Sequence, residues 1–327
     1  MKIKQIPEDF VVKEIANIKL DGGSFAYFKL KKKLWNTIDA VNEIAKVLNV
    51  NFNRLRYAGI KDRQAVTEQF ISAENVSKEA LEKAKVKDIE IEYLGQSSER
   101  MHTGLLIGNE FIITIRDIDE QLEAVKFIPN YFDDQRFGLN SNNHLVGKAL
   151  LQKDFKKACE LMELEVFNND YINALKRKKA VLKLCFNAYQ SYLFNEALKV
   201  YIQKNSEFKE AEYNLGKLAF PKNKIENFTL PLLQFDTELE ENIKEIYEEI
   251  LSKEKITKRD FIIRQFPDLL QITQDRKAFI EVEDFETIEF SDDELNEDKK
   301  KQIVRFKLPK GSYATIAIKA LAINLNS

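Results

Sequence analysis

Hydrophobic and polar positions alternate through much of the first 140 residues, and this pattern predicts short strands with a few helices between them. Residues 8–15 and 24–30 alternate in strand fashion, and Gly22-Gly23 marks the turn between them. A helix capped by Asn36 or Thr37 follows, with a predicted buried face of Ile38, Val41, Ile44, Ala45 and Leu48. The other predicted elements are a strand, loop and strand over 54–72, a helix near 77–85, and strands near 88–94 and 109–116.

The pattern becomes helical in the second half of the chain. Residues 143–254 are predicted to be helical almost throughout, with helices at 144–163, 169–182, 186–204 and 237–253. Strand character returns at 278–290 and 302–308 around an acidic tip, and an apolar segment follows at 313–325. We therefore predict an α+β protein in which a domain formed by residues 1–152 and 278–327 is interrupted by a mainly helical insertion, residues 153–277.

Composition places the chain among globular proteins of the cytoplasm. Its 327 residues suit two domains, and 44% of them are hydrophobic. No apolar run approaches the length of a membrane span, and the N-terminus does not resemble a signal peptide. The two cysteines favour a reducing compartment. No long heptad seam calls for a dimer, so we expect a monomer with no obligate protein partner.

The scarcity of certain residues excludes several kinds of chemistry. The chain has two histidines, His102 and His144, and neither has a second ligand at zinc-binding spacing. It also lacks a Cys-x-x-Cys pair, a Gly-x-Ser-x-Gly elbow and a glycine-rich phosphate loop. We expect an enzyme without metal or cofactor that uses carboxylates, amides and aromatic side chains.

Charge is uneven along a chain whose net charge is −2. Residues 1–65 hold thirteen Lys and Arg against seven Asp and Glu, and acidic residues gather at 237–254 and 281–298. Basic runs at 31–33 and 176–179 suit contacts with RNA phosphates, although solvated surface clusters have the same composition. Charge alone leaves both interpretations open.

Residues 57–69, Tyr-Ala-Gly-Ile-Lys-Asp-Arg-Gln-Ala-Val-Thr-Glu-Gln, place Asp62 between two cations on a loop ahead of a strand. On residue types alone, a charged hairpin tip is the more common explanation of such a stretch. The string resembles the signature G-x-K-D-x-x-A-x-T-x-Q of the TruD family of tRNA pseudouridine synthases, in which the Asp is the catalytic nucleophile.

Four further segments resemble the same family, in the family's order. They are Pro7 to Glu14 preceded by Lys4, the stretch Pro-Asn-Tyr-Phe-Asp-Asp-Gln-Arg-Phe-Gly at 129–138, Gln-Ser-Tyr-Leu-Phe-Asn at 190–195, and Leu-Pro-Lys-Gly-Ser-Tyr-Ala-Thr at 308–315. Together they extend over nearly the whole chain. The segment 129–138 departs from the family pattern at one place. Asp133-Asp134 replaces the usual Gly-x and adds two negative charges.

The resemblance implies a function and a set of site residues. It implies a mixed, largely antiparallel catalytic sheet and the isomerisation of uridine to pseudouridine in tRNA, at uridine 13 of the D arm as in bacterial members. Asp62 would be the nucleophile, attacking the sugar or the base or assisting a glycal route. Lys4 would be its electrostatic partner, and a flipped base would be held by Phe10, Asn130, Phe132 and Tyr313. Gln69 would orient the Asp62 loop or contact the base.

A second class of function fits the same residues. A protein that keeps the fold but has lost catalysis would bind RNA or act as an RNA chaperone. The intact surroundings of Asp62 argue against this alternative, since a non-catalytic protein has no need of that carboxylate.

Overall fold

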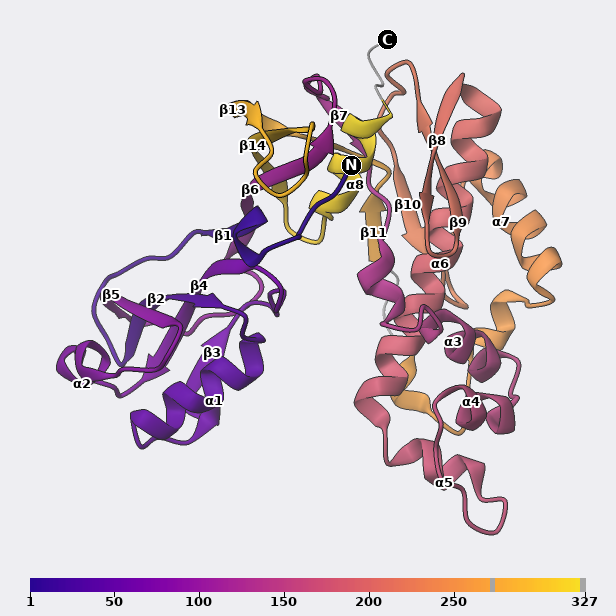
Figure 1. Ribbon diagram of the computed structural model, residues 1–327. Helices are drawn as coiled ribbons and strands as arrows, with labels where there is room; N and C mark the ends of the chain where they lie inside the picture. Colours follow the sequence, from indigo (N-terminus) through magenta and orange to yellow (C-terminus); the bar gives the residue numbers. More distant parts are fainter. Residues whose placement is uncertain (271–273, 324–327) are drawn as a thin grey trace. The chain divides into compact units, whose positions relative to one another are not determined.

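The computed structural model describes residues 1–270 and 274–323, and the chain forms two compact units (Figure 1). Unit 1 comprises Met1–Lys126 and Val282–Gly311, and unit 2 comprises Phe127–Glu281 and Ser312–Ser327. The polypeptide therefore leaves unit 1, forms most of unit 2, returns to complete the first unit and ends in the second.

Unit 1 is built on one eight-stranded sheet. Its strands pair in the order β13-β14-β6-β1-β4-β2-β5, and β3 also pairs with β4. Within this fully described unit, β1 and β4 run parallel and the other strand pairs are antiparallel, as predicted for the fold class. The strands are β1 (Phe10–Ala16), β2 (Phe25–Lys33), β3 (Leu55–Tyr57), β4 (Val66–Glu74), β5 (Ile89–Ser97), β6 (Leu106–Ile118), β13 (Glu283–Asp292) and β14 (Lys300–Pro309).

Helix α1 (Thr37–Val47) packs against this sheet, and α2 (Lys78–Lys83) contacts β5. The side chain of Asn36 caps α1 by accepting a hydrogen bond from the Asp39 backbone N–H at 2.8 Å. Val41 and Ile44 are buried as predicted. The predicted burial of Ile38 is wrong, since 43% of its surface is exposed. The buried stripe instead begins at Thr37, which lies 100° away from Ile38 around the helix axis.

Unit 2 surrounds the 27-residue helix α6 (Lys179–Asn205). Helices α3 (Asn143–Leu151) and α7 (Glu241–Glu254) pack directly against α6. The other helices are α4 (Phe155–Leu161), α5 (Tyr171–Lys176) and α8 (Ala314–Ala322). Buried side chains occur on several sides of α6, as expected for a helix in the centre of its unit. None of the described helices is long and apolar enough to cross a membrane.

Short strands in unit 2 make part of the helical prediction wrong. Residues 208–221 form the hairpin of β8 (Phe208–Tyr213) and β9 (Gly216–Pro221), and β10 (Thr229–Leu232) pairs with β11 (Gln274–Lys277). Gly216 adopts φ +125°, which suits the turn of the hairpin. Strand β8 is amphipathic with only one fully buried residue, so its pattern of charges resembles that of an exposed helix.

The boundaries of the compact units differ from the predicted division at residues 152 and 277. Residues 127–152 belong to unit 2, because β7 (Phe127–Pro129) pairs with β12 (Phe279–Glu281) and α3 packs on α6. The predicted apolar segment 313–325 also belongs there, since its described part forms α8, which contacts β7. Its last two residues lie outside the described part of the chain.

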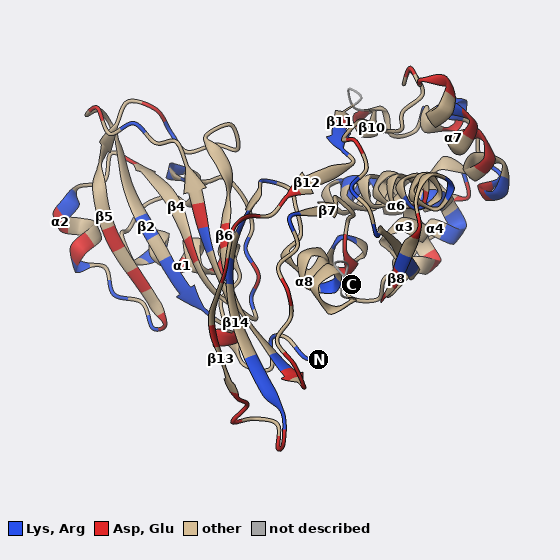
Figure 2. Ribbon diagram, turned by 90° about the horizontal axis from the view of Figure 1, so that it is seen from above, with Lys and Arg blue, Asp and Glu red and all other residues tan. Residues whose placement is uncertain are grey.

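Basic positions on β2 lie beside acidic positions on the neighbouring strand β5 of the unit 1 sheet (Figure 2). Lys29 and Lys31 of β2 pair with Glu92 and Glu90 of β5 at 3.0 and 3.2 Å. The acidic residues of β13 pair in the same way with β14, as in Asp284–Lys307 at 2.7 Å. These cross-strand ion pairs offset much of the charge that the sequence places on single segments.

Candidate active site

Asp62 lies on the loop between β3 and β4, as the sequence predicts. Its carboxylate oxygen Oδ2 is 2.7 Å from the Nζ atom of Lys4, and these side chains are 21% and 25% exposed respectively. A carboxylate so placed is reachable from solvent and keeps a cation at hydrogen-bonding distance. The ion pair also fixes the orientation of the carboxylate, as a nucleophile requires.

Lys4 is held in place by an uncommon backbone and by Phe10. Its φ of +59° is left-handed, a conformation that non-glycine residues rarely adopt. The Nζ atom lies 3.9 Å from the centroid of the Phe10 ring, close enough for a cation–π interaction. Phe10 itself is 4% exposed and packs edge-on against Phe111. In this structure Phe10 therefore supports the lysine that faces Asp62.

Buried polar groups brace the loop that carries Asp62. The side chain of Gln69 is fully buried; its Nε2 donates to the backbone oxygen of Gly59 at 3.3 Å, and its Oε1 accepts from Thr37 Oγ1 at 2.9 Å. Thr37 Oγ1 in turn accepts from the Lys61 backbone N–H at 2.9 Å. Of the two roles considered for Gln69, these contacts favour orientation of the loop.

The residue before Asp62 anchors the loop to the sheet. The Nζ atom of Lys61 is 2.9 Å from Glu14 Oε1, with both side chains nearly buried, and 2.8 Å from Asn109 Oδ1. The other oxygen of Glu14 accepts from the Phe70 backbone N–H at 2.9 Å. Lys61 and Glu14 come from two of the segments that carry the family resemblance, so the structure shows why both residues occur together.

Lys32 is a residue of this site that the sequence interpretation missed. Only 1% of its surface is exposed, and its Nζ donates to the backbone oxygens of Asp62 at 3.1 Å and Trp35 at 2.6 Å. Burial lowers the pKa of its ammonium group to about 8. The suggestion that Lys32 contacts RNA is thus wrong. The alternation of β2 contained the signal, because Phe28, Leu30 and Lys32 share the face turned to the core.

A second group of predicted residues lies in unit 2, around Phe132. Asn195 on α6 donates to the Phe132 backbone oxygen at 2.8 Å and accepts from its N–H at 2.9 Å. The Phe132 ring makes edge contacts with Phe194 and Tyr313, at centroid distances of 5.5 and 6.0 Å. The segment at 190–195 therefore fixes Phe132 and places aromatic surface around it.

Two arginines lie against the ring of Phe132. The guanidinium of Arg276 lies 4.1 Å from the centroid of Phe132 and donates to the backbone oxygen and Oδ1 of Asn130, at 2.9 and 2.6 Å. Arg136 lies on the same ring at 5.2 Å and donates to Ser191 Oγ at 2.8 Å. Burial lowers the pKa of Arg276 to about 10.

Asn130 is already engaged within the protein. Its Nδ2 donates to the backbone oxygen of Lys277 at 3.0 Å while its Oδ1 accepts from Arg276. Within the described part of the chain, these bonds use one N–H and one lone pair of the amide, which has one more of each. No sequence pattern pointed to Arg276, because it is separated from Asn130 by 146 residues and belongs to none of the segments that resemble the family.

The unusual Asp133 and Asp134 share one cation within the protein. Lys319 of α8 lies 2.6 Å from Asp133 and 3.5 Å from Asp134. Asp134 also accepts a hydrogen bond from the Asn214 backbone N–H at 2.7 Å. The two negative charges that set this segment apart from the family pattern are therefore partly offset by one nearby cation.

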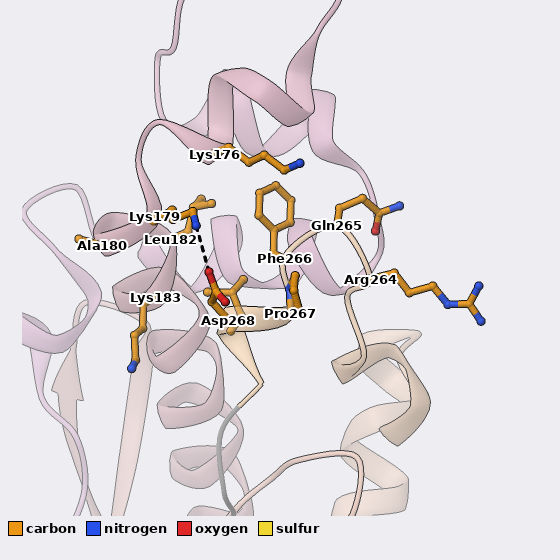
Figure 3. Close-up of a pocket in the computed structure, with 11 residues that line it drawn as sticks. Lys176, Lys179, Ala180, Leu182, Lys183, Arg264, Gln265, Phe266, Pro267 and Asp268 are labelled. Atoms are coloured by element: carbon orange, nitrogen blue, oxygen red, sulfur yellow. Dashed lines mark hydrogen bonds and ion pairs between the residues drawn. The ribbon is translucent and has the colours of Figure 1, made fainter.

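A cavity of about 630 Å³ occurs elsewhere in unit 2, where the start of α6 meets residues 264–269 (Figure 3). None of the predicted site residues lines it. Its rim carries basic side chains, and its inner surface is apolar, formed in part by Leu182, Phe266 and Leu269. The basic run at 176–179 thus borders a real cavity rather than a flat surface.

Comparison with known proteins identifies the family. The family model of tRNA pseudouridine synthase D (TruD) matches residues 1–169 and 218–321. The chain belongs to the TruD family. Among its relatives, the "Probable tRNA pseudouridine synthase D" of Methanococcus vannielii is 31% identical, with 99% of this chain and 95% of the relative aligned. That of Methanosarcina acetivorans is 29% identical over 406 aligned positions, covering 97% of this chain and 91% of the relative.

A solved structure agrees with this assignment. The putative TruD protein of Methanosarcina mazei superposes with a TM-score of 0.74 at 27% identity, covering 99% of this chain and 94% of that one. The predicted family and fold class are therefore confirmed, and with them the class of enzyme, a tRNA pseudouridine synthase. The 406 aligned positions exceed the 327 residues of this chain, so the Methanosarcina acetivorans relative carries insertions that are absent here.

Proposed function

We propose that this TruD-family protein converts uridine 13 in the D arm of tRNA to pseudouridine, with Asp62 as its nucleophile. The observation that carries the proposal is the geometry of Asp62. Its carboxylate is accessible to solvent, lies 2.7 Å from the Lys4 ammonium and sits on a loop braced by buried hydrogen bonds. An accessible carboxylate on a loop held by buried hydrogen bonds is what a preorganised nucleophile needs.

The reaction breaks the bond between uracil N1 and the sugar C1′ and forms one between C5 and C1′, while C5 loses its proton and N1 gains one. Asp62 attacks the sugar C1′ or the base C6, or assists a glycal route; the contacts of the free protein are compatible with each of these. Lys4 holds the carboxylate by an ion pair at 2.7 Å in the free protein. As the reaction proceeds, the same ammonium becomes available to offset negative charge near the bond that breaks.

The group around Phe132 is proposed to hold the detached uracil. Phe132 and Tyr313 supply flat apolar surface for the base, while Phe10 supports Lys4. Asn130 has one donor and one acceptor left for a pyrimidine edge, and Arg276 fixes the orientation of its amide. Holding the base while it turns prevents its loss as free uracil.

The substrate is recognised chiefly by its backbone and shape in this proposal. Double-stranded RNA presents phosphates and 2′-hydroxyls rather than readable base edges, so tRNA affinity should fall steeply as salt increases. The monomeric state and the cytoplasmic location remain predictions from the sequence.

The test is incubation of unmodified tRNA transcripts with the wild type and the Asp62→Asn variant, followed by mapping of pseudouridine. We expect modification at position 13 by the wild type alone. Binding without modification by both proteins would support the RNA-chaperone alternative. Modification of a different uridine would support the proposed reaction but would show that uridine 13 is not the target.

A further inference from the structure

We propose that Lys32 is a positioning residue of this reaction, which rests on the proposed role of Asp62. Its ammonium group fixes the backbone of Asp62 from the core side and thereby directs the carboxylate toward Lys4. The proposal starts from two hydrogen bonds, from Nζ to the backbone oxygen of Asp62 at 3.1 Å and to that of Trp35 at 2.6 Å.

The position of Lys32 explains why a charged group stands inside unit 1. A lysine that is 1% exposed has lost its hydration, which is costly unless its hydrogens find partners. Its two carbonyl partners belong to the chain segments on either side of α1, namely the end of β2 and the Asp62 loop. Lys32 therefore ties the loop to β2, a strand that is paired on both sides within the sheet.

Lys32 cannot act on RNA directly, because the protein covers its side chain. Its influence on the reaction must therefore pass through Asp62. A displacement of about 1 Å in a catalytic group can cost about 100-fold in rate. Loss of the hydrogen bonds made by Lys32 should consequently lower kcat while leaving tRNA binding nearly unchanged.

The test compares Lys32→Met with Lys29→Met, an exposed lysine on the same strand, by steady-state kinetics on a tRNA transcript. We expect kcat of Lys32→Met to fall about 10- to 100-fold with KM within about twofold of the wild type, and Lys29→Met to retain both constants. A kcat within about twofold of the wild type overturns the proposal, as does a rise in KM that accounts for the whole loss.

Two further measurements keep the result interpretable. If Lys32→Met does not fold, as judged by Trp35 fluorescence, Lys32→Gln replaces it under the same criteria. Activity of Asp62→Asn is measured in parallel. An active Asp62→Asn refutes the proposed nucleophile, whereas an inactive Asp62→Asn beside a fully active Lys32→Met refutes only the role of Lys32.

An independent observation concerns the cavity in Figure 3, which we propose to be a subsite for a nucleotide of the bound tRNA. Basic side chains from two distant segments surround it: Lys176, Lys179, Lys183 and Arg264. The one acidic residue in its lining is Asp268, which pairs with Lys179 at 3.0 Å. Among the described residues, no carboxylate lies within ion-pair distance of Lys183 or Arg264.

The chemistry of the cavity matches that of a nucleotide. An apolar inner surface suits a base, and exposed ammonium and guanidinium groups at the rim suit a phosphate. The volume of about 630 Å³ is ample for one nucleotide. The charge argues for a polyanion such as RNA over an apolar peptide, and the substrate of the family supplies that polyanion.

The test measures how binding of an unmodified tRNA transcript depends on KCl. The Lys183→Gln/Arg264→Gln variant should bind more weakly, with a slope of log K against log salt smaller by about one to two. The control is Lys156→Gln/Lys255→Gln, two exposed lysines of unit 2 outside the cavity, with unchanged slope expected. Equal slopes for the two variants refute the subsite, whatever the outcome for Asp62.

Discussion

Replacing Lys32 with methionine should change how the stability of unit 1 depends on pH. Burial lowers the pKa of the Lys32 ammonium from its ordinary value of 10.5 to about 8 in the folded protein. The charged groups that face it act more weakly and in opposite directions, since the Asp62 carboxylate raises this pKa and the Lys61 ammonium lowers it. Methionine is similar in length and does not titrate, so the variant removes this effect alone from the pH dependence.

The magnitude follows from the two pKa values. The gap between 10.5 and about 8 corresponds to about 3 kcal/mol, at about 1.36 kcal/mol for each pH unit. Because the folded state has the lower pKa, the unfolded chain binds more protons between the two values, and stability rises with pH there. From pH 7 to about pH 9.5, the wild type should gain about 2 kcal/mol that Lys32→Met does not gain.

The assay uses the single tryptophan of the chain, Trp35, whose backbone oxygen accepts a hydrogen bond from Lys32. Urea denaturation followed by its fluorescence reports the unfolding of unit 1 at each pH. Other titrating groups are common to both proteins and cancel in the comparison. The hydrogen bonds lost in the variant add an offset that is nearly independent of pH. A stability difference that stays constant between the two pH values refutes the buried charge.

Three other substitutions test the contacts around the site. Lys4→Met should lower kcat about 10- to 100-fold with little change in tRNA affinity, as measured by single-turnover kinetics and filter binding, and a wild-type rate would contradict the partnership with Asp62. Asn195→Ala leaves the buried backbone N–H and oxygen of Phe132 without partners, and it should lower the free energy of unfolding by about 2 kcal/mol. An unchanged melting temperature would show that these two hydrogen bonds do not stabilise the protein. Glu14→Gln leaves the ammonium of Lys61 buried without its carboxylate, and it should destabilise unit 1 by about 3 kcal/mol in urea denaturation. An unchanged stability would contradict the role of this ion pair.

Much of unit 1 could be predicted from the sequence because its signals are local. Period-two alternation located β1, β2, β4 and β6, and the side chain of Asn36 marked the start of α1. The resemblance of five segments then supplied the family, which the comparisons confirm. The position of Asp62 on a loop followed from the strands on either side of it.

The parts that could not be predicted depend on contacts between distant residues. Arg276 meets Asn130 only after 146 residues of intervening chain have folded. Lys32 was assigned to the surface because it lies in a run of three lysines, although the alternation of β2 placed it on the buried face. The hairpin of β8 and β9 was missed because a half-exposed strand rich in charge carries a weak periodic signal.

The central claim is that the carboxylate of Asp62 performs the chemistry and is not needed for binding. The direct measurement is a single-turnover reaction on one unmodified tRNA transcript, with pseudouridine formation and tRNA binding determined in the same samples for the wild type and Asp62→Asn. We predict equal binding by the two proteins and pseudouridine formation by the wild type only. Pseudouridine formation by Asp62→Asn at the wild-type rate would contradict the assignment.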